Sequence, residues 1–262
     1  MPLFTDIRSV NLPPQPGIVS LVPSLTELLY DLELDEQVTG ITRFCIHPAS
    51  WYRTKTRIGG TKDLKLPLIK SLRPGLIIAS KEENVREQVE ELALEFPVWL
   101  TDVRTLEGAL LVIREAGLLL SRTVQAESLY LQVHESFKRL IPLAAEPVSA
   151  VYLIWKNPYM TVGADTFIHD IMVAAGFVNM FGNEQRYPVI DIAVLQSKKP
   201  QLLLLSSEPY PFRNDDLDEL QELLPATRIV LVDGALFSWY GSRLRLSAAY
   251  LQLLKADTRP SS

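Results

Sequence analysis

The chain has 262 residues and a mass of 29.5 kDa, which is enough for one or two domains with a substantial hydrophobic core. Its 47% hydrophobic and 22% charged residues are typical of a globular protein. The net charge of −5 and the pI of about 5.4 exclude the clustered basic surface that binds nucleic acid or an anionic membrane.

The single cysteine, Cys45, excludes an internal disulfide. No apolar run approaches the ~18 residues of a membrane helix, so we expect no membrane insertion. The N-terminus has neither the basic nor the apolar region of a signal peptide. The sequence as it stands therefore predicts a cytoplasmic protein, or a periplasmic or surface-anchored one if a leader has been removed.

The first elements are expected after a Pro-rich, polar arm over residues 1–16. Residues 18–22 form a short apolar strand, and the helix that follows has Ser24 as its N-cap and Glu27 at the capping-box spacing. Ser24 has a second interpretation. A loop at the carboxyl end of a strand that leads into a helix N-terminus often faces a ligand crevice.

Strands and helices then alternate. We predict strands over 38–42, 76–79 and 97–102, helices over 66–72 and from about 82 to 94, and a loop rich in aromatic and reactive groups over 43–52. The pair Gly59–Gly60 predicts a tight turn. This alternation is typical of a parallel sheet that carries helices on both faces.

A long amphipathic segment over 105–141 predicts one long helix, or a shorter helix that leads into a long one at Gly117. The segments on its two sides resemble each other. Pro74 and Pro200 each precede an apolar strand, and Glu82 and Glu208 each follow one, at a constant offset of 126 residues. The repeat predicts two similar α/β lobes joined by a helical spine.

The second half continues the alternation. We predict strands over 148–155, 202–205 and 228–233, and helices over 166–175, 190–198 and 244–254, with Gly176 as a helix C-cap. The domain boundaries that follow are an arm (1–16), an N-terminal lobe (17–104), the spine (105–146), a C-terminal lobe (147–255) and a tail (256–262).

Catalytic and metal-binding chemistry is sparse. His47 lies two residues from Cys45 in the 43–52 loop, and the two could offer a soft metal two ligands. Nothing at metal-ligand spacing supplies further ligands, so His47 is the better candidate for an axial ligand to the metal of a bound chelate. No GxSxG elbow is present, and no nucleophile has an obvious base, so we expect no enzyme and no intrinsic cofactor.

Aromatic side chains gather in the predicted strand–helix loops at one end of the sheets. Flat apolar walls with few polar anchors suit a large, rigid ligand. Some of these rings are also candidates for the core, Trp51 and Trp155 above all. The candidates for these ligand-contacting rings are Phe44, His47, Trp51, Trp155, Tyr159, Phe237, Trp239 and Tyr240.

Several segments, taken in order, resemble the substrate-binding proteins of cobalamin and iron-siderophore ABC importers, in the helical-backbone metal-receptor superfamily. They are Val19 to Glu27, Gly40-Ile41, Gly59-Gly60, Leu72 to Ile78, Gly176 to Asn179, and Lys199 to Leu203. The resemblance covers about residues 17–255 and is greatest to the vitamin B12-binding type. It implies a class III periplasmic-binding-protein-like fold, with two α/β lobes on one long backbone helix and the ligand between them.

The resemblance also implies roles for single residues. Phe44 stands at the position where the family has a tyrosine in its ligand cleft. Phe237, with Trp239 close by in the sequence, stands at the position of a tryptophan in that cleft. Thr61 falls where a further tryptophan stands, so one stacking wall is missing here.

Docking to an ABC permease is a second family property. In the family, a glutamate on each lobe docks onto the permease. The corresponding positions here are Pro67 and Ala193, so the docking glutamates are missing, and Asp63 and Asp191 lie nearby in the sequence as substitutes. We therefore expect either a transport receptor or a cytoplasmic relative that keeps the fold and the cleft.

The functional hypothesis is non-enzymatic binding of a large metal chelate, a corrinoid first and an iron-siderophore or haem second. Arg43, Lys62 and Arg243 are expected to meet polar or anionic ligand edges. The acidic run at 82–84 either anchors the ligand or forms a helix N-terminus. The alternatives are a small enzyme acting on a metal cofactor and a ligand-free interaction module.

Overall fold

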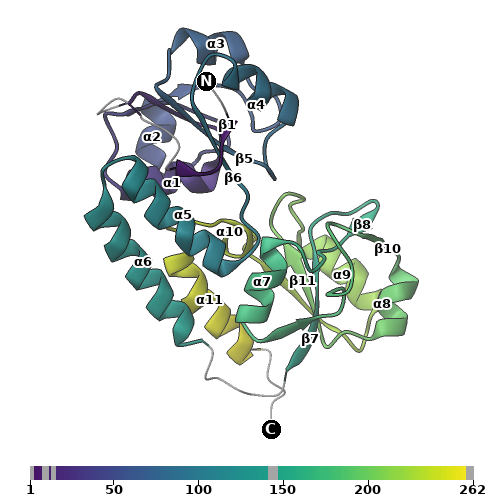
Figure 1. Ribbon diagram of the computed structural model, residues 1–262. Coiled ribbons are helices and arrows are strands. Elements are labelled where there is room, and N and C mark those ends of the chain that lie inside the picture. The colour runs from purple at the N-terminus through teal and green to yellow at the C-terminus, as the bar shows by residue number, and fades with distance from the viewer. Residues whose placement is uncertain (1–2, 8–11, 13–15, 141–146, 258–262) are drawn as a thin grey trace. The chain divides into compact units, whose positions relative to one another are not determined.

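A computed structural model describes residues 3–7, 12, 16–140 and 147–257. The chain divides into two compact units, which Figure 1 shows and which are described separately. The first unit comprises residues 1–103, 107–132 and 240–243, and the second comprises 104–106, 133–239 and 244–262.

The first unit is built on a six-stranded parallel sheet with the strand order β1-β6-β5-β2-β3-β4. Its strands are β1 (Leu3–Phe4), β2 (Ile18–Ser20), β3 (Val38–Ile41), β4 (Thr56–Arg57), β5 (Leu76–Ser80) and β6 (Val98–Thr101). The helices between them are α1 (Pro23–Asp31), α2 (Ala49–Thr54), α3 (Leu66–Ser71) and α4 (Arg86–Ala93).

The second unit contains a four-stranded parallel sheet with the order β12-β11-β7-β9, and a separate antiparallel ribbon of two short strands. Its strands are β7 (Val148–Leu153), β8 (Tyr159–Met160), β9 (Phe177–Asn179), β10 (Val189–Ile190), β11 (Leu202–Ser206) and β12 (Arg228–Val232). Its helices are α7 (Phe167–Ala174), α8 (Ile192–Lys198), α9 (Asn214–Leu223), α10 (Ala235–Ser238) and α11 (Leu244–Asp257).

The repeated strands β5 and β11 lie inside the two sheets, and all five residues of each are buried. Continuous apolar runs such as these are typical of parallel strands covered on both faces. The repeat extends to the local backbone. Arg73 and Lys199, which precede the two prolines, both adopt left-handed conformations, with φ of 48° and 50°. The expectation of an α/β fold with parallel sheets is confirmed.

Of the two predictions for the 105–141 segment, a shorter helix that leads into a longer one is confirmed, and a single continuous helix is not observed. The segment forms α5 (Leu106–Leu119) and α6 (Thr123–Lys138), and residues 141–146 of the predicted spine lie outside the described residues. Ser121 interrupts the helix with a φ of 56°, and the Arg122 N–H donates to the Gly117 carbonyl at 2.7 Å. Close packing explains the glycine, because a Cβ at Gly117 would lie 2.2 Å from the Ala126 Cβ.

Two predicted helix caps are also wrong. Pro23 is the first residue of α1 and Val22 is its N-cap, without a side-chain cap, so Ser24 lies inside the helix. Val85, not the acidic run 82–84, caps α4. Asn84 accepts a hydrogen bond from the Ser80 N–H at 2.8 Å instead. The C-cap of α7 is Ala175, and Gly176, the predicted cap, follows it with a left-handed φ of 80°.

Several elements were not predicted. The 43–52 segment, expected as a loop, contains the start of α2, and the sequence analysis did not identify the helices α9 and α10 or the strands β1, β4, β8, β9 and β10. Of these, β1 lies within the predicted arm 1–16. Strands of two or three residues are too short to show a periodicity. In the described part of the chain, no helix is long and apolar enough to cross a membrane.

We predict that Gly117→Ala lowers the free energy of unfolding by about 1–3 kcal/mol, because overpacking the α5–α6 contact outweighs the higher helix propensity of alanine. Urea denaturation measures the change. Leu118→Ala in the same helix is the control, since Leu118 is 61% exposed and should lose little. A Gly117→Ala protein as stable as the wild type would contradict the close contact.

Candidate ligand-binding site

The carboxyl ends of the parallel strands in the first unit carry an exposed cation and an exposed ring. Arg43 and Phe44 follow β3, and the Arg43 guanidinium lies 5.0 Å from the centre of the Phe44 ring. Both Arg43 nitrogens donate to the Asp63 carboxylate, at 3.0 and 3.1 Å. Phe44 is 49% exposed. The ring is therefore accessible, and the charge of Arg43 already has a partner.

The Gly59–Gly60 turn makes this arrangement sterically feasible. Gly59 has a φ of 105°, and a Cβ at Gly60 would lie 2.2 Å from Asp63 Oδ1 and 3.0 Å from a Phe44 ring carbon. The predicted tight turn is confirmed. Gly60 lets the Asp63 carboxylate and the Phe44 ring lie against the backbone, and Gly59 leaves room for the backbone carbonyl of Asp63, 2.4 Å from where its Cβ would lie.

Two further candidates follow this turn. The Thr61 carbonyl accepts a hydrogen bond from Asn84 Nδ2 at 3.1 Å. Lys62 is exposed, and its Nζ donates to the Glu82 carbonyl at 3.0 Å. The contacts connect the turn to the loop that follows β5, so both loops form one polar surface.

Trp51 belongs to the core instead of an accessible wall. It is 1% exposed, its indole nitrogen donates to Asp35 Oδ1, and its ring meets Tyr30 edge to face at 5.4 Å. Since α2 carries Trp51 into the interior, the structure leaves it no exposed face for a ligand. This corrects the prediction for Trp51.

Ser24 and Cys45 are buried as well. Ser24 is 1% exposed, and its Oγ has no hydrogen-bond partner among the described residues. Cys45 Sγ lies 3.1 Å from the hydroxyls of both Thr26 and Thr42. Burial raises the pKa of the Cys45 thiol to about 11, against the smaller opposing effect of these hydrogen bonds. A protonated, inaccessible thiol suits neither a nucleophile nor a metal ligand.

His47 is exposed in the same loop, so its imidazole is accessible. Across the described residues, no group of three or more His, Cys, Asp and Glu side chains is placed to hold a metal ion. The axial-ligand role of His47 stays a prediction.

Residues 240–243 bring two candidates into the first unit. Arg243 makes a bidentate ion pair with Glu27 of α1, at 2.7 and 3.0 Å, and the two side chains are only 11% and 14% exposed. Tyr240 is 5% exposed, and its hydroxyl lies 3.1 Å from Thr101 Oγ1. Burial raises the Tyr240 pKa, so the hydroxyl stays neutral. Arg243 thus joins residues 240–243 to α1 through Glu27, and Tyr240 joins them to β6 through Thr101.

The second unit presents two tryptophans. Trp155, just beyond β7, is 41% exposed and meets Tyr210 edge to face at 5.9 Å. Trp239 is partly buried at the end of α10, and its Nε1 donates to Glu208 Oε1 at 2.9 Å. These rings are the accessible indoles of the candidate site, because Trp51 and Trp99 are each 1% exposed.

Two further ring candidates of the second unit, Tyr159 and Phe237, are less exposed than Trp155. Tyr159 is partly buried, which raises its pKa, and it lies in β8 near Lys156. Lys156 Nζ contacts Asp216 at 2.8 Å and Glu219 at 2.6 Å, and these hydrogen bonds raise the Lys156 pKa. Phe237 is fully buried and packs on Tyr152 at 4.9 Å. It is therefore a core ring, which corrects its prediction as a wall of the ligand site.

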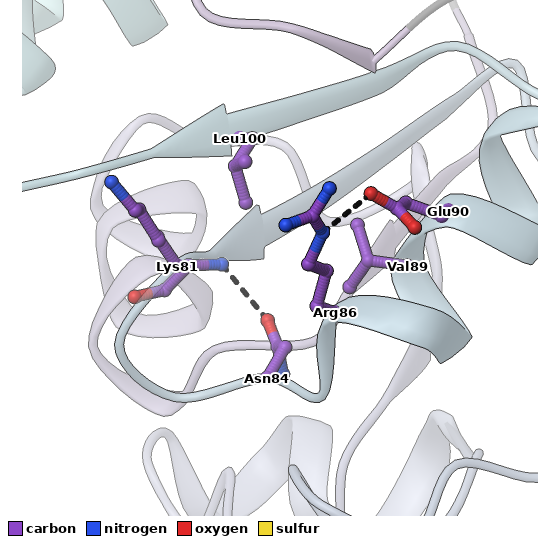
Figure 2. A pocket seen from close by; sticks show the side chains of 7 residues that line it. Lys81, Asn84, Arg86, Val89, Glu90 and Leu100 are labelled. Carbon is purple, nitrogen blue, oxygen red and sulfur yellow. Dashed lines mark hydrogen bonds and ion pairs between the residues drawn. The ribbon is translucent and has the colours of Figure 1, made fainter.

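One cavity of about 230 Å³ lies in the first unit between the start of α4 and strands β5 and β6 (Figure 2). Its lining is mainly apolar and includes Val89 and Leu100. The cations beside it are paired: Lys81 lies 2.9 Å from Asp102, and Arg86 lies 2.6 Å from Glu90. The cavity offers a small apolar recess and no free charge to select an anion.

Sequence comparison identifies the family. The model of the family described as periplasmic binding protein matches residues 18–228. The chain belongs to this family. Two relatives of this chain are the vitamin B12-binding proteins of Vibrio campbellii, 24% identical over 78% of this chain and 75% of the relative, and of Pectobacterium carotovorum, 22% identical over 88% and 85%.

Solved structures show the same fold. The haem-binding protein RhuT of Roseiflexus aligns with this chain with a TM-score of 0.80 and 21% identity, over 92% of this chain and 98% of RhuT. The vitamin B12-binding protein BtuF of Vibrio cholerae aligns with a TM-score of 0.79 and 16% identity, over 94% and 99%. Similarity at these identities establishes the architecture, and the two neighbours bind different chelates.

We expect Glu27→Ala to lower the free energy of unfolding by about 3–5 kcal/mol, because it removes the carboxylate that makes the bidentate ion pair with the nearly buried Arg243. Asp63→Ala is the matched control. It removes the exposed partner of Arg43 and should cost less than about 1 kcal/mol. Urea denaturation of both proteins makes the comparison. Equal losses would show that burial does not distinguish the two ion pairs.

The Cys45 thiol should not react with a thiol-specific chromogenic disulfide at pH 8 in the folded protein, because it is buried and its raised pKa keeps it protonated. In denaturant the same reagent should titrate one thiol per chain. Because pH 8 lies below the Cys45 pKa of about 11, the thiol of the folded protein is neutral and unreactive at this pH. Rapid reaction in the native state would contradict this environment.

Proposed function

We propose that the chain is a non-enzymatic binding protein for a large metal chelate, with a corrinoid as the first candidate and an iron-siderophore or haem as the second. The observation that carries the proposal is the family match over residues 18–228, in a group of relatives named for vitamin B12 binding. Structural neighbours named for haem binding support the second candidate.

The accessible side chains at the strand ends support this chemistry. Phe44, Trp155 and Trp239 offer aromatic surface, which binds a large flat ligand by burying apolar area. Arg43 and Lys62 lie in the first unit, as Phe44 does, and are exposed cations for polar ligand edges. His47 is the candidate axial ligand to the metal of the chelate, which belongs to the ligand and not to the protein.

The enzyme alternative receives no support from this site. The Cys45 thiol is buried and protonated, and the relatives are named as binding proteins. The partner of a transport receptor would be an ABC permease, and the family description favours the periplasm as the compartment. Pro67 on α3 and Ala193 on α8 stand where the family has its docking glutamates, and the exposed acids Asp63 and Asp191 near them are the proposed substitutes, one in each unit.

We expect the purified protein to bind cyanocobalamin, or else haemin or a ferric siderophore, saturably at micromolar or lower concentration. Phe44→Ala and Trp239→Ala should each weaken binding roughly tenfold or more, since exposed aromatic anchors supply much of the binding energy of such sites. Absorption spectra and tryptophan fluorescence quenching, recorded in parallel, measure the affinities.

Leu94→Ala is the control, because Leu94 is 78% exposed, is the C-cap of α4 and is not one of the candidate site residues. It should bind like the wild type. A well-folded protein that binds none of the three chelates would overturn the proposal and favour the ligand-free interaction module.

A further inference from the structure

A carboxylate in the second unit fixes the direction of an accessible indole. Glu208 Oε1 accepts hydrogen bonds from Trp239 Nε1 at 2.9 Å and from Ser238 Oγ at 2.7 Å. An indole N–H can only donate, and a partly buried one needs an acceptor. The Trp239 backbone N–H also bonds to the Ala235 carbonyl at 3.1 Å. Trp239 is therefore held at its backbone and at the far edge of its ring.

The loop that carries Glu208 has a buried support. The Glu208 N–H donates to Ser206 Oγ at 3.3 Å, and Ser206 Oγ in turn accepts from the Tyr152 hydroxyl at 2.9 Å. Gly234 leaves the necessary space, because a Cβ there would lie 2.6 Å from Glu208 Cγ. The position of the carboxylate thus depends on residues that are well inside the unit.

The same loop supports the second accessible tryptophan. Tyr210, two residues beyond Glu208, donates its backbone N–H to the Ile154 carbonyl at 3.2 Å. Its ring meets Trp155 edge to face, and Phe212 packs against Tyr210 at 4.7 Å. One loop between β11 and α9 therefore contacts both Trp155 and Trp239.

We propose that Glu208 is a positioning residue for ligand binding: its carboxylate fixes the Trp239 ring before the ligand arrives. The proposal rests on the proposed function for its effect on affinity, whereas the effect on the indole is a property of the free protein. A preorganised ring loses less conformational freedom on binding, which raises affinity without a direct contact from Glu208.

The first test observes the free protein. In a ¹⁵N–¹H spectrum, Glu208→Ala should shift the Trp239 indole N–H resonance, assigned with Trp239→Phe, and speed its exchange with water. Glu208→Gln retains an acceptor oxygen and should stay close to the wild type. Glu222→Ala, which removes an exposed acid of α9, is the charge-matched control and should leave the resonance unchanged. An unshifted Trp239 signal in Glu208→Ala would overturn the proposal.

The second test uses cyanocobalamin, followed by haemin. Glu208→Ala should weaken binding roughly three- to tenfold, the effect of one lost hydrogen bond, and Glu208→Gln should recover most of it. In a Trp239→Phe background, Glu208→Ala should have no further effect. If Glu208→Ala weakens binding in the Trp239→Phe background as much as in the wild type, Glu208 does not act through Trp239. If the wild type binds neither probe, the proposed function fails, while the spectrum of the free protein still decides the positioning of the indole.

Discussion

The burial of the parallel strands is the constraint on which the rest of this structure depends. β5 and β11 have every residue buried, so each must be covered on both faces and can expose polar groups only at its ends. Parallel pairing places the carboxyl ends of neighbouring strands at one edge. Arg43 after β3 and Lys62 after β4 gather in this way in the first unit, and Trp155 after β7 and Glu208 after β11 do so in the second.

The repeat shows how one local design serves two chemistries. Both Ser80 and Ser206 end a buried strand, and each hydroxyl accepts the backbone N–H of a glutamate two residues later, Glu82 or Glu208. The carbonyl of Glu82 then accepts the Lys62 ammonium, whereas the side chain of Glu208 accepts the Trp239 indole. The same strand-end turn therefore supports a cationic surface in the first unit and an aromatic one in the second.

The sequence was most informative where hydrophobic periodicity extends over several residues. The buried strands, most of the helices that flank them and the turn at Gly59 were predictable, because burial and backbone sterics act locally. The helix break was predicted only as an alternative, near Gly117, because it depends on the contact of Gly117 with Ala126. Nor could the burial of Trp51 and Phe237 be separated from the exposure of Trp155, because an aromatic residue in a loop serves core and site equally well. Glu208 was visible as a repeat position, and only the structure connects it to Trp239.

The central claim is that a metal chelate binds against the accessible rings at the strand ends. Titration of ¹⁵N-labelled protein with cyanocobalamin, haemin and a ferric siderophore, observed at the four indole N–H signals, tests it most directly. The account predicts that one chelate shifts or broadens the Trp155 and Trp239 signals at stoichiometric amounts and leaves the buried Trp51 and Trp99 signals in place. Unchanged Trp155 and Trp239 signals in excess of all three chelates would contradict it.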